Sequence, residues 1–179
     1  MSNIRELESS NRNINITWLI ALFTRFVQSL HPYYPIKGLW RLHKLLYRLL
    51  PAYRGVVRLP DGICIYLDPG RSGLEKWVFY SGIFEPTLSR LLQHYAPVGG
   101  YCMDVGAHFG MHTLRLARKV GLQGKVISFE ANPATAKELA ANVVRTGFQN
   151  VEIIPKAVHD CSGKVIPLYI SSPGTTSIL

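Results

Sequence analysis

Short apolar runs and amphipathic stretches alternate through the second half of the chain. The segments 102–105 and 126–129 are apolar runs of the kind shown by parallel strands that are buried on both faces. The stretch between them separates apolar from basic positions: apolar Leu114, Leu116, Ala117 and Val120, and basic Arg115, Arg118 and Lys119. We therefore predict strand 101–105, helix 109–120 and strand 125–129 as a βαβ unit, with the basic side chains facing away from the sheet.

The same patterning predicts the elements around this unit. An antiparallel hairpin is expected from 56–59 and 63–67, turning at Pro60-Asp61-Gly62. The other predicted elements are helices 74–79, 86–95 and 133–146 and strands 151–155 and 165–170. The fold class is therefore α/β, a mostly parallel Rossmann-like sheet with helices on both faces. Three segments are expected: a basic helical leader at 1–53, a hairpin and helical entry segment at 54–100, and the sheet domain at 101–179.

The leader carries most of the positive charge. Residues 1–58 hold nine Lys or Arg and two Glu, a balance of +7, whereas residues 59–179 balance at +2. An apolar stretch at 16–30 contains Arg25 and is too short to span a bilayer. The stretch 37–50 is predicted to be a helix with leucines on one face and bases on the other, at Lys37, Arg41, Lys44 and Arg48. Such a helix either lies on an anionic membrane surface or packs on its own domain with its basic face in water.

Composition and cysteine usage narrow the class of protein. The chain is 47% hydrophobic and 17% charged, which is typical of a globular protein. Its three cysteines, Cys64, Cys102 and Cys161, have no metal-binding spacing, so no metal site is predicted, and Cys102 is expected to be buried in a strand. Free thiols and the lack of a convincing secretory signal favour a reducing, cytoplasmic location, peripheral to the membrane if the leader docks there. The bases lack aromatics that would stack along a groove, so no nucleic-acid partner is expected.

The turn after the first predicted strand carries the candidate chemistry. Asp104, Gly106 and Gly110 give a D-x-G-x-x-x-G spacing, and Glu130 ends the next strand. Ligands of such sheets sit at the carboxyl ends of the strands, where Glu130 can accept hydrogen bonds from both ribose hydroxyls. The G-x-G-x-x-G pattern of dinucleotide binding is absent. An acid-flanked loop suits a cofactor with a positive sulfonium and no pyrophosphate, with Asp104 orienting the loop and countering a ligand cation. The alternative is a turn whose glycines merely permit tight packing.

Several motifs resemble the FkbM-type methyltransferases that use S-adenosylmethionine (SAM). They are Asp104-Val-Gly-Ala-His-Phe-Gly110, Gly124-Lys-Val-Ile-Ser-Phe-Glu-Ala-Asn-Pro133, Leu139-Ala-Ala-Asn142, Gly147-Phe-Gln-Asn150-Val, Ala157-Val-His-Asp160-Cys-Ser-Gly163 and Ser81-Gly82-Ile-Phe-Glu85-Pro. The resemblance covers residue 55 to the C-terminus. It implies a class I methyltransferase fold, SAM as methyl donor and a hydroxyl of a sugar or other small molecule or glycan as acceptor. The cofactor contacts that it implies are Glu85, Asp104, Gly106, Ala107, His108, Gly110, Glu130, Asn132 and Ala157. His108 stands where the family usually shows Asn, and Ala131 where it usually shows Pro.

The catalytic residues are left open by the sequence. A hydroxyl acceptor benefits from a general base, and His108 and His112 are candidates because the glycine loop faces the cofactor. Either histidine can instead simply shape the loop or the helix surface. His159 and Asp160 follow a predicted strand and can line the pocket, but the run from Asp160 to Gly163 is also an ordinary turn sequence.

The resemblance also predicts that the sheet lacks part of its cover. FkbM-type sequences continue into an Asp-x-Glu-Gly segment and later strands, whereas this sequence stops at Leu179. Strand 101–105 is therefore expected to have an uncovered edge, which favours a partner chain or self-association. Two interpretations stay open, an active SAM-dependent methyltransferase and a truncated, inactive remnant or interaction module that keeps the cofactor-binding half. A NAD-binding protein is a distant third.

Overall fold

A computed structural model describes residues 22, 48–50, 53–165, 167–172 and 175–178. The chain divides into two compact units, 1–53 and 54–179. The predicted apolar stretch at 16–30 and nearly all of the basic helix at 37–50 lie outside the described residues, so both stay predictions. Within the described ranges, no helix is long and apolar enough to cross a membrane.

The second unit begins with the predicted hairpin. Strands β1 (Gly55–Arg58) and β2 (Cys64–Leu67) pair antiparallel, with Val57 opposite Ile65. The turn closes through Leu59, whose N–H donates to the carbonyl of Ile63 at 2.8 Å. The hairpin expected from the Pro-Asp-Gly signal is confirmed.

Two helices connect the hairpin to the sheet. Helix α3 (Gly73–Ser81) is capped by Ser72, whose hydroxyl accepts from the Glu75 N–H at 3.0 Å. It ends at Gly82, which takes the left-handed conformation that closes many helices. Helix α4 (Pro86–Tyr95) starts with proline at its first position, where a missing N–H removes no helical hydrogen bond. Both helices occur where apolar periodicity predicted them, with α3 slightly longer than expected.

A three-stranded parallel sheet forms the centre of the unit. Its strands are β3 (Tyr101–Val105), β4 (Lys125–Phe129) and β5 (Val151–Ile154), in the order β3-β4-β5. Helix α5 (Met111–Val120) crosses from β3 to β4, and helix α6 (Pro133–Thr146) crosses from β4 to β5. The α/β class and these elements were predicted, except that α5 starts two residues later than expected, because the loop extends through Gly110.

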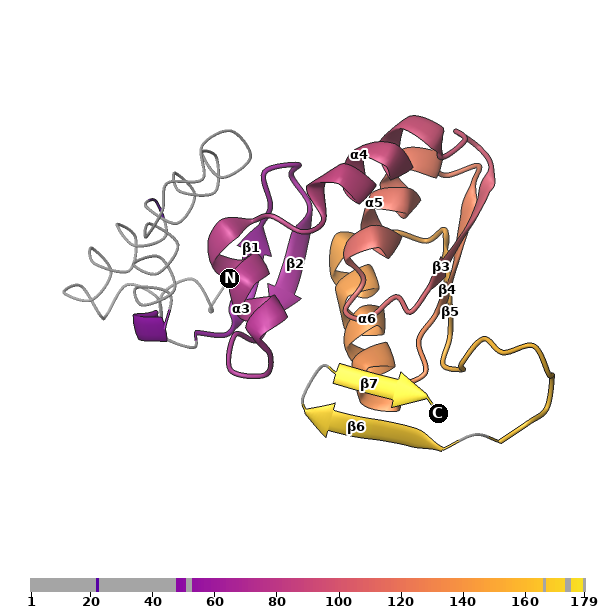
Figure 1. Ribbon diagram of the computed structural model, residues 1–179. Coiled ribbons are helices and arrows are strands. Elements are labelled where there is room, and N and C mark those ends of the chain that lie inside the picture. The colour runs from indigo at the N-terminus through magenta and orange to yellow at the C-terminus, as the bar shows by residue number, and fades with distance from the viewer. Residues whose placement is uncertain (1–21, 23–47, 51–52, 166, 173–174, 179) are drawn as a thin grey trace. The chain divides into compact units, whose positions relative to one another are not determined.

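The expectation of helices on both faces is wrong for the described part of the chain. Helices α5 and α6 lie on the same side of the sheet (Figure 1). The side chains of Tyr101, Met103 and Val105, which alternate along β3, are 75%, 66% and 61% exposed. Cys102 was expected to be buried and is only half-buried, because β3 is an edge strand in the described sheet. Partial burial still raises the pKa of its thiol.

The prediction that Arg115 on α5 faces away from the protein is wrong. We expected it to face away with Arg118, but it is only 6% exposed. Its Nε donates to Asp61 Oδ2 at 2.7 Å and its Nη1 to the Ser89 hydroxyl at 2.6 Å. The side of α5 that looked solvent-facing therefore packs on the hairpin turn and on α4. A buried guanidinium is tolerated there because its donors are satisfied.

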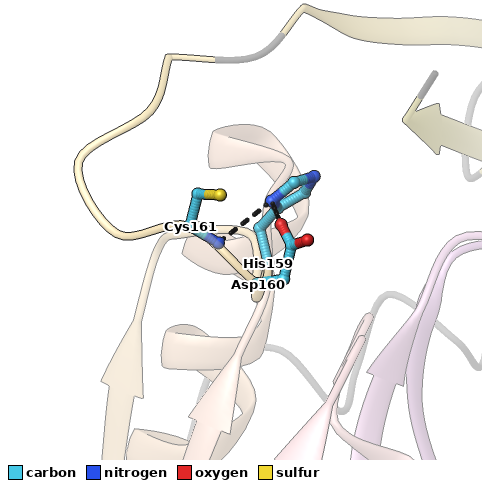
Figure 2. A group of neighbouring side chains, drawn as sticks. All are labelled: His159, Asp160 and Cys161. Carbon is cyan, nitrogen blue, oxygen red and sulfur yellow. Dashed lines mark hydrogen bonds and ion pairs between the residues drawn. The ribbon is translucent and has the colours of Figure 1, made fainter.

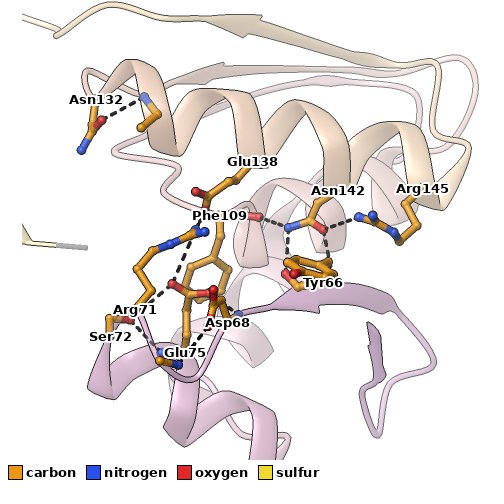
Figure 3. Close-up of polar contacts among 12 residues, drawn as sticks. Tyr66, Asp68, Arg71, Ser72, Glu75, Phe109, Asn132, Glu138, Asn142 and Arg145 are labelled. Carbon is orange, nitrogen blue, oxygen red and sulfur yellow. Dashed lines mark hydrogen bonds and ion pairs between the residues drawn. The ribbon is translucent and has the colours of Figure 1, made fainter. Parts of the chain in front are cut away.

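The hairpin and the sheet domain share one apolar core. Its fully buried members come from β2, α3, the glycine loop, α5 and α6, and include Ile65, Leu67, Val78, Phe109, Leu114 and Leu139. A hydrogen bond also joins the hairpin to the sheet domain: the Asn142 carboxamide on α6 accepts from the Tyr66 N–H on β2 at 2.9 Å (Figure 3). The two predicted segments 54–100 and 101–179 are thus packed together.

A second hairpin follows the sheet. Strands β6 (Leu168–Ser172) and β7 (Thr175–Ile178) pair antiparallel, with an irregularity between Ile170 and Ser172. The sequence predicted one strand at 165–170, so the first strand is shifted toward the C-terminus and the second was missed.

Candidate cofactor site

The loop between β3 and α5 bends over the carboxyl end of β4. The N–H groups of Gly106 and Ala107 both donate to the Phe129 carbonyl, at 2.9 and 3.0 Å. Gly106 has a φ of 79° and His108 a φ of 50°, so the loop turns twice through the left-handed region. A glycine adopts this region freely, whereas His108 is held there against its own preference.

Glu130 is the best-held acid at this end of the sheet. It follows β4 and is 7% exposed. Its Oε2 accepts from the His108 N–H at 2.8 Å, and its Oε1 accepts from the Asn132 N–H at 2.9 Å. A carboxylate offers about four acceptor positions, so two bonds to the backbone leave each oxygen able to accept another. The structure therefore brings the predicted residues Glu130, His108 and Asn132 together around one carboxylate.

The far end of the loop is fixed to α6. A Cβ on Gly110, whose φ is 99°, would lie 2.6 Å from the Leu139 side chain. The Phe109 carbonyl accepts from the Asn142 side chain at 3.0 Å, and Asn142 is 1% exposed (Figure 3). Close packing and a buried hydrogen bond thus set the position at which α5 begins.

Asp104 is tied to its neighbours rather than left open. Its Oδ2 accepts from the Thr113 hydroxyl at 2.5 Å, and that hydroxyl lies 2.9 Å from the hydroxyl of Ser128. Thr113 and Ser128 are both fully buried. The three side chains connect β3, α5 and β4, so this carboxylate braces the sheet under the loop.

The other predicted contacts are arranged around these groups. Ala107 is buried in the loop, and Ala157 is half-buried in the segment after β5. Asn132 also caps α6, because its side chain accepts from the Ala134 N–H at 3.0 Å (Figure 3). Glu85 is the N-cap of α4, and its Oε2 lies 2.8 Å from His112 Nε2.

A further polar cluster follows β5. The side chains of His159, Asp160 and Cys161 are all exposed, and their donor atoms lie within 4.8 Å of one another (Figure 2). His159 Nδ1 lies against the Asp160 carboxylate, and the Cys161 N–H lies 3.3 Å from the same nitrogen. As arranged, the ring offers a ligand only its other nitrogen, so the group is best described as an exposed turn whose side chains satisfy one another.

Comparison with known proteins gives partial structural matches. No protein-family model and no curated protein sequence matches the chain. A SAM-dependent methyltransferase from Aquifex aeolicus matches over 40% of this chain and 37% of its own, with 27% identity and a TM-score of 0.36. An O-methyltransferase from Bacillus cereus in complex with S-adenosylhomocysteine (SAH) matches over 40% of this chain and 34% of its own, with 27% identity and a TM-score of 0.36. Trm5b from Pyrococcus abyssi matches over 56% of this chain and 27% of its own, with 24% identity and a TM-score of 0.43.

Part of the chain aligns with part of each of these three solved structures. The match spans 37%, 34% and 27% of the lengths of these three proteins.

Several residues that build the site were missed by sequence reasoning. Thr113 and Ser128 connect β3, α5 and β4, and Arg115 contacts Asp61 on the distant hairpin turn. Thr113 and Ser128 left a weak signal, since each is a polar residue within an otherwise apolar pattern, whereas Arg115 left none, because it stands beside two other bases. Asn142 was quoted only as part of a motif, and its role in holding the loop needed the packed structure.

Proposed function

We propose that this chain binds SAM at the carboxyl ends of β3 and β4 and that its activity is methyl transfer. The observation that carries the proposal is the Glu130 carboxylate, which is buried beside the glycine loop and oriented by the backbone N–H groups of His108 and Asn132. Such an acid, fixed in place before any ligand arrives, can accept hydrogen bonds from both hydroxyls of one ribose.

The negative charge of the residues at the loop favours SAM over a dinucleotide as the ligand. Two acids, Glu130 beside the loop and Asp104 at the end of β3, lie at this place, and a pyrophosphate placed there would be repelled. SAM has no pyrophosphate, and its sulfonium and α-ammonium groups are both positive. The loop also lacks the first glycine of the dinucleotide-binding pattern, which makes the tight turn there.

For the methyl acceptor, we propose a hydroxyl of a sugar or other small molecule or glycan, in an FkbM-type O-methylation. In that reaction the acceptor oxygen attacks the methyl carbon, the carbon–sulfur bond breaks with its electron pair going to sulfur, and the hydroxyl proton is released. Because this is an in-line displacement, positioning supplies much of the rate. His108 and His112 stay candidates for the group that takes the proton.

Calorimetry on the full chain tests the cofactor assignment. We expect SAM and SAH to bind and NAD not to. Replacing Glu130 with Ala is expected to weaken SAH binding by about 1.5–3 kcal/mol, the value of hydrogen bonds to a charged group. Tight NAD binding without SAM binding would overturn the cofactor assignment, and an unchanged SAH affinity in Glu130→Ala would overturn the role of this acid.

One observation favours a second candidate, a cofactor-binding module that associates through its sheet. In the described sheet, β3 pairs only with β4, and three apolar side chains on β3 are exposed: Tyr101, Met103 and Val105. An open strand edge beside an apolar surface promotes pairing between chains. We propose that a second copy covers this surface. Sedimentation over a range of concentrations is expected to show association without methyl transfer, and a monomer that turns over SAM would contradict this candidate.

A further inference from the structure

A row of large apolar side chains is exposed along one side of α4. Leu88, Leu91 and Tyr95 are spaced at i, i+3 and i+7, so they share one face of the helix. All three are exposed, Tyr95 to 74%. The other face of α4 is used inside the protein, where Ser89 is buried and Leu92 packs on the core beside α5. The exposed row therefore faces away from the core of its own unit.

Two turns next to the end of α4 carry further exposed apolar side chains. Val98, in the turn between α4 and β3, is 78% exposed, and Leu122, in the turn between α5 and β4, is 84% exposed. The backbone joins the two turns, because the Gly99 N–H donates to the Val120 carbonyl at 2.7 Å. Together with the row on α4, these side chains form an apolar patch, which consists of Leu88, Leu91, Tyr95, Val98 and Leu122.

The apolar patch lies at the end of the sheet opposite to the proposed cofactor site. Strands β3 and β4 are parallel and start side by side, with Tyr101 opposite Lys125, so the turns that lead into them meet at one end. The glycine loop and Glu130 follow the other ends of the same strands (Figure 1). Five strand residues span about 17 Å. Binding at the patch therefore leaves the cofactor site uncovered.

The chain around the apolar patch is basic. Residues 86–129, which contain α4, α5 and both turns, hold five Lys or Arg and one acid, a balance of +4. That acid, Asp104, lies near the carboxyl end of β3, away from the patch. Arg90 is exposed on α4, and Lys119 lies in the last turn of α5. The charges that accompany the patch along the chain are therefore positive.

Two acids from other elements contact bases in this part of the molecule, and both are paired. Asp61, in the hairpin turn, lies 2.7 Å from Arg115 Nε and 3.9 Å from Arg118 Nη2. Glu152, on β5, lies 2.7 Å from Lys125 Nζ. Each carboxylate is thus compensated by its own bases, and neither offsets the positive charge of the other bases beside the patch.

This combination of apolar and basic side chains fits a membrane surface that contains anionic lipids. Leucine and tyrosine side chains enter the interfacial layer, and Lys and Arg beside them are attracted to anionic headgroups. A nucleic acid would gain little from Leu and Val, which offer no ring for a base to stack on. A second copy would place two positive surfaces against each other, because a two-fold contact pairs the same patch with itself.

We infer that the apolar patch docks this protein on a membrane surface that contains anionic lipid. Val98 and Leu122 enter the headgroup layer, and Arg90 and Lys119 lie against the lipid phosphates. The inference goes beyond the proposed function, because it concerns the opposite end of the sheet and requires no cofactor. It also differs from the prediction for the leader, because it assigns the contact to the second unit. In this orientation the cofactor site faces the aqueous side.

Co-sedimentation of the full chain with vesicles tests the inference. We expect binding to mixed phosphatidylcholine–phosphatidylserine vesicles, at least about tenfold weaker binding to phosphatidylcholine alone, and loss of binding as salt rises. Val98→Ser is expected to weaken binding to the mixed vesicles about threefold to fivefold, and Val98→Ser with Leu122→Ser about tenfold or more, because apolar insertion is lost. Val144→Ser, which changes a valine on α6 that is 79% exposed, is the matched control and is expected to leave binding unchanged.

A second set of variants separates the apolar patch from the leader. Lys119→Gln is expected to weaken binding to the mixed vesicles about fivefold, the effect of one cation near an anionic surface, and to leave binding to phosphatidylcholine unchanged. A leader variant replaces Arg41, Lys44 and Arg48 with Gln. In that background, Val98→Ser with Leu122→Ser is expected to weaken binding by the same factor as in the wild type, because the two surfaces act independently.

Each other outcome overturns the inference. It is wrong if the wild-type chain binds neither kind of vesicle, or if Val144→Ser weakens binding as much as Val98→Ser. It is wrong if only the leader variant loses binding, since the leader is then the anchor. It is also wrong if the wild-type chain associates without vesicles and Val98→Ser with Leu122→Ser is monomeric, since a second copy then covers the patch.

Two further measurements keep this inference separate from the proposed function. Calorimetry with SAH is expected to give the same affinity for the wild type and for Val98→Ser with Leu122→Ser, because the site lies at the other end of the sheet. Absence of SAH binding in the wild type would overturn the proposed function and leave the membrane inference standing. Melting curves of the variants establish that each is folded, so that lost vesicle binding reports on the patch.

Discussion

Two glutamates flank the glycine loop and are held in opposite ways. Glu130 is 7% exposed, and both of its oxygens accept from backbone N–H groups, those of His108 and Asn132. The Glu85 side chain is 54% exposed, and its carboxylate contacts another side chain, that of His112. Glu130 follows a strand in ordinary geometry, whereas Glu85 sits in a strained left-handed conformation.

The two carboxylates are held in place by different parts of the structure. The position of Glu130 is set by local backbone around the end of β4, so it stabilises the loop even without a ligand. The position of Glu85 is set by packing between α4, α5 and the hairpin turn, so it depends on distant residues. We expect substitution of Glu130 to lower both the free energy of unfolding and the ligand affinity, and substitution of Glu85 to lower the ligand affinity.

The largest effect is expected from removing the support of Glu85. Arg115→Met leaves the Asp61 carboxylate and the Ser89 hydroxyl without their buried partner, and breaking such a pair costs about 3–5 kcal/mol. The midpoint of thermal unfolding should fall steeply. Arg118→Met, at a side chain that is 39% exposed, is the control, and an equal loss there would show that Arg115 contributes no more than a surface charge.

The loop between the two acids gives the next largest effect. Gly110→Ala places a Cβ 2.6 Å from Leu139 in a backbone with a φ of 99°, so strain and overpacking together should cost about 2–3 kcal/mol. Gly106→Ala, with a φ of 79° and nothing within 4 Å of the added carbon, should cost about 1 kcal/mol from strain alone. Denaturant unfolding measures both, and equal losses would contradict the packing argument.

Replacing each glutamate by glutamine compares the two acids directly. Glu130→Gln turns one backbone acceptor into a donor, and it is expected to lower the free energy of unfolding of the unliganded chain by about 2 kcal/mol. Glu85→Gln is expected to lower it by less than about 0.5 kcal/mol, as for a surface position. Denaturant unfolding without ligand is the measurement, and the comparison fails if Glu85→Gln costs as much as Glu130→Gln.

The smallest effect is expected at Asn132. Asn132→Ala removes the side-chain cap of α6 but keeps the backbone N–H that holds Glu130, so stability should fall by about 1 kcal/mol. SAH affinity should stay within about twofold, because the carboxylate keeps its orientation. A large loss of affinity, measured by calorimetry, would mean that the Asn132 side chain itself contacts the ligand.

The sheet and its helices could be predicted because their signals are local. The strands predicted at 101–105 and 125–129 and the helix predicted at 133–146 match β3, β4 and α6. The predicted ends of helices also agree where a glycine or proline marks them, as at Gly147 and Pro86. The strand at 175–178 was missed because its residues alternate too weakly to be distinguished from a loop.

The site could be predicted only in part, because much of it depends on contacts between distant segments. Glu130 could be predicted because it ends the strand that follows the D-x-G-x-x-x-G turn. The burial of Arg115 could not be predicted. A base beside Arg118 and Lys119 indicates a helix face in water, and only the folded structure shows that the hairpin turn packs on Arg115. The one-sided sheet likewise contradicted a pattern that is typical of strands buried on both faces.

The ribose assignment at Glu130 is tested most directly by comparing SAH with its 2′,3′-dideoxy analogue on two proteins. Calorimetry on the wild-type chain is expected to show the analogue binding at least about tenfold more weakly, because two hydrogen bonds to the carboxylate are lost. On Glu130→Ala the two ligands are expected to bind equally, within about twofold. Equal binding on the wild type, or an unchanged penalty on Glu130→Ala, would contradict the account.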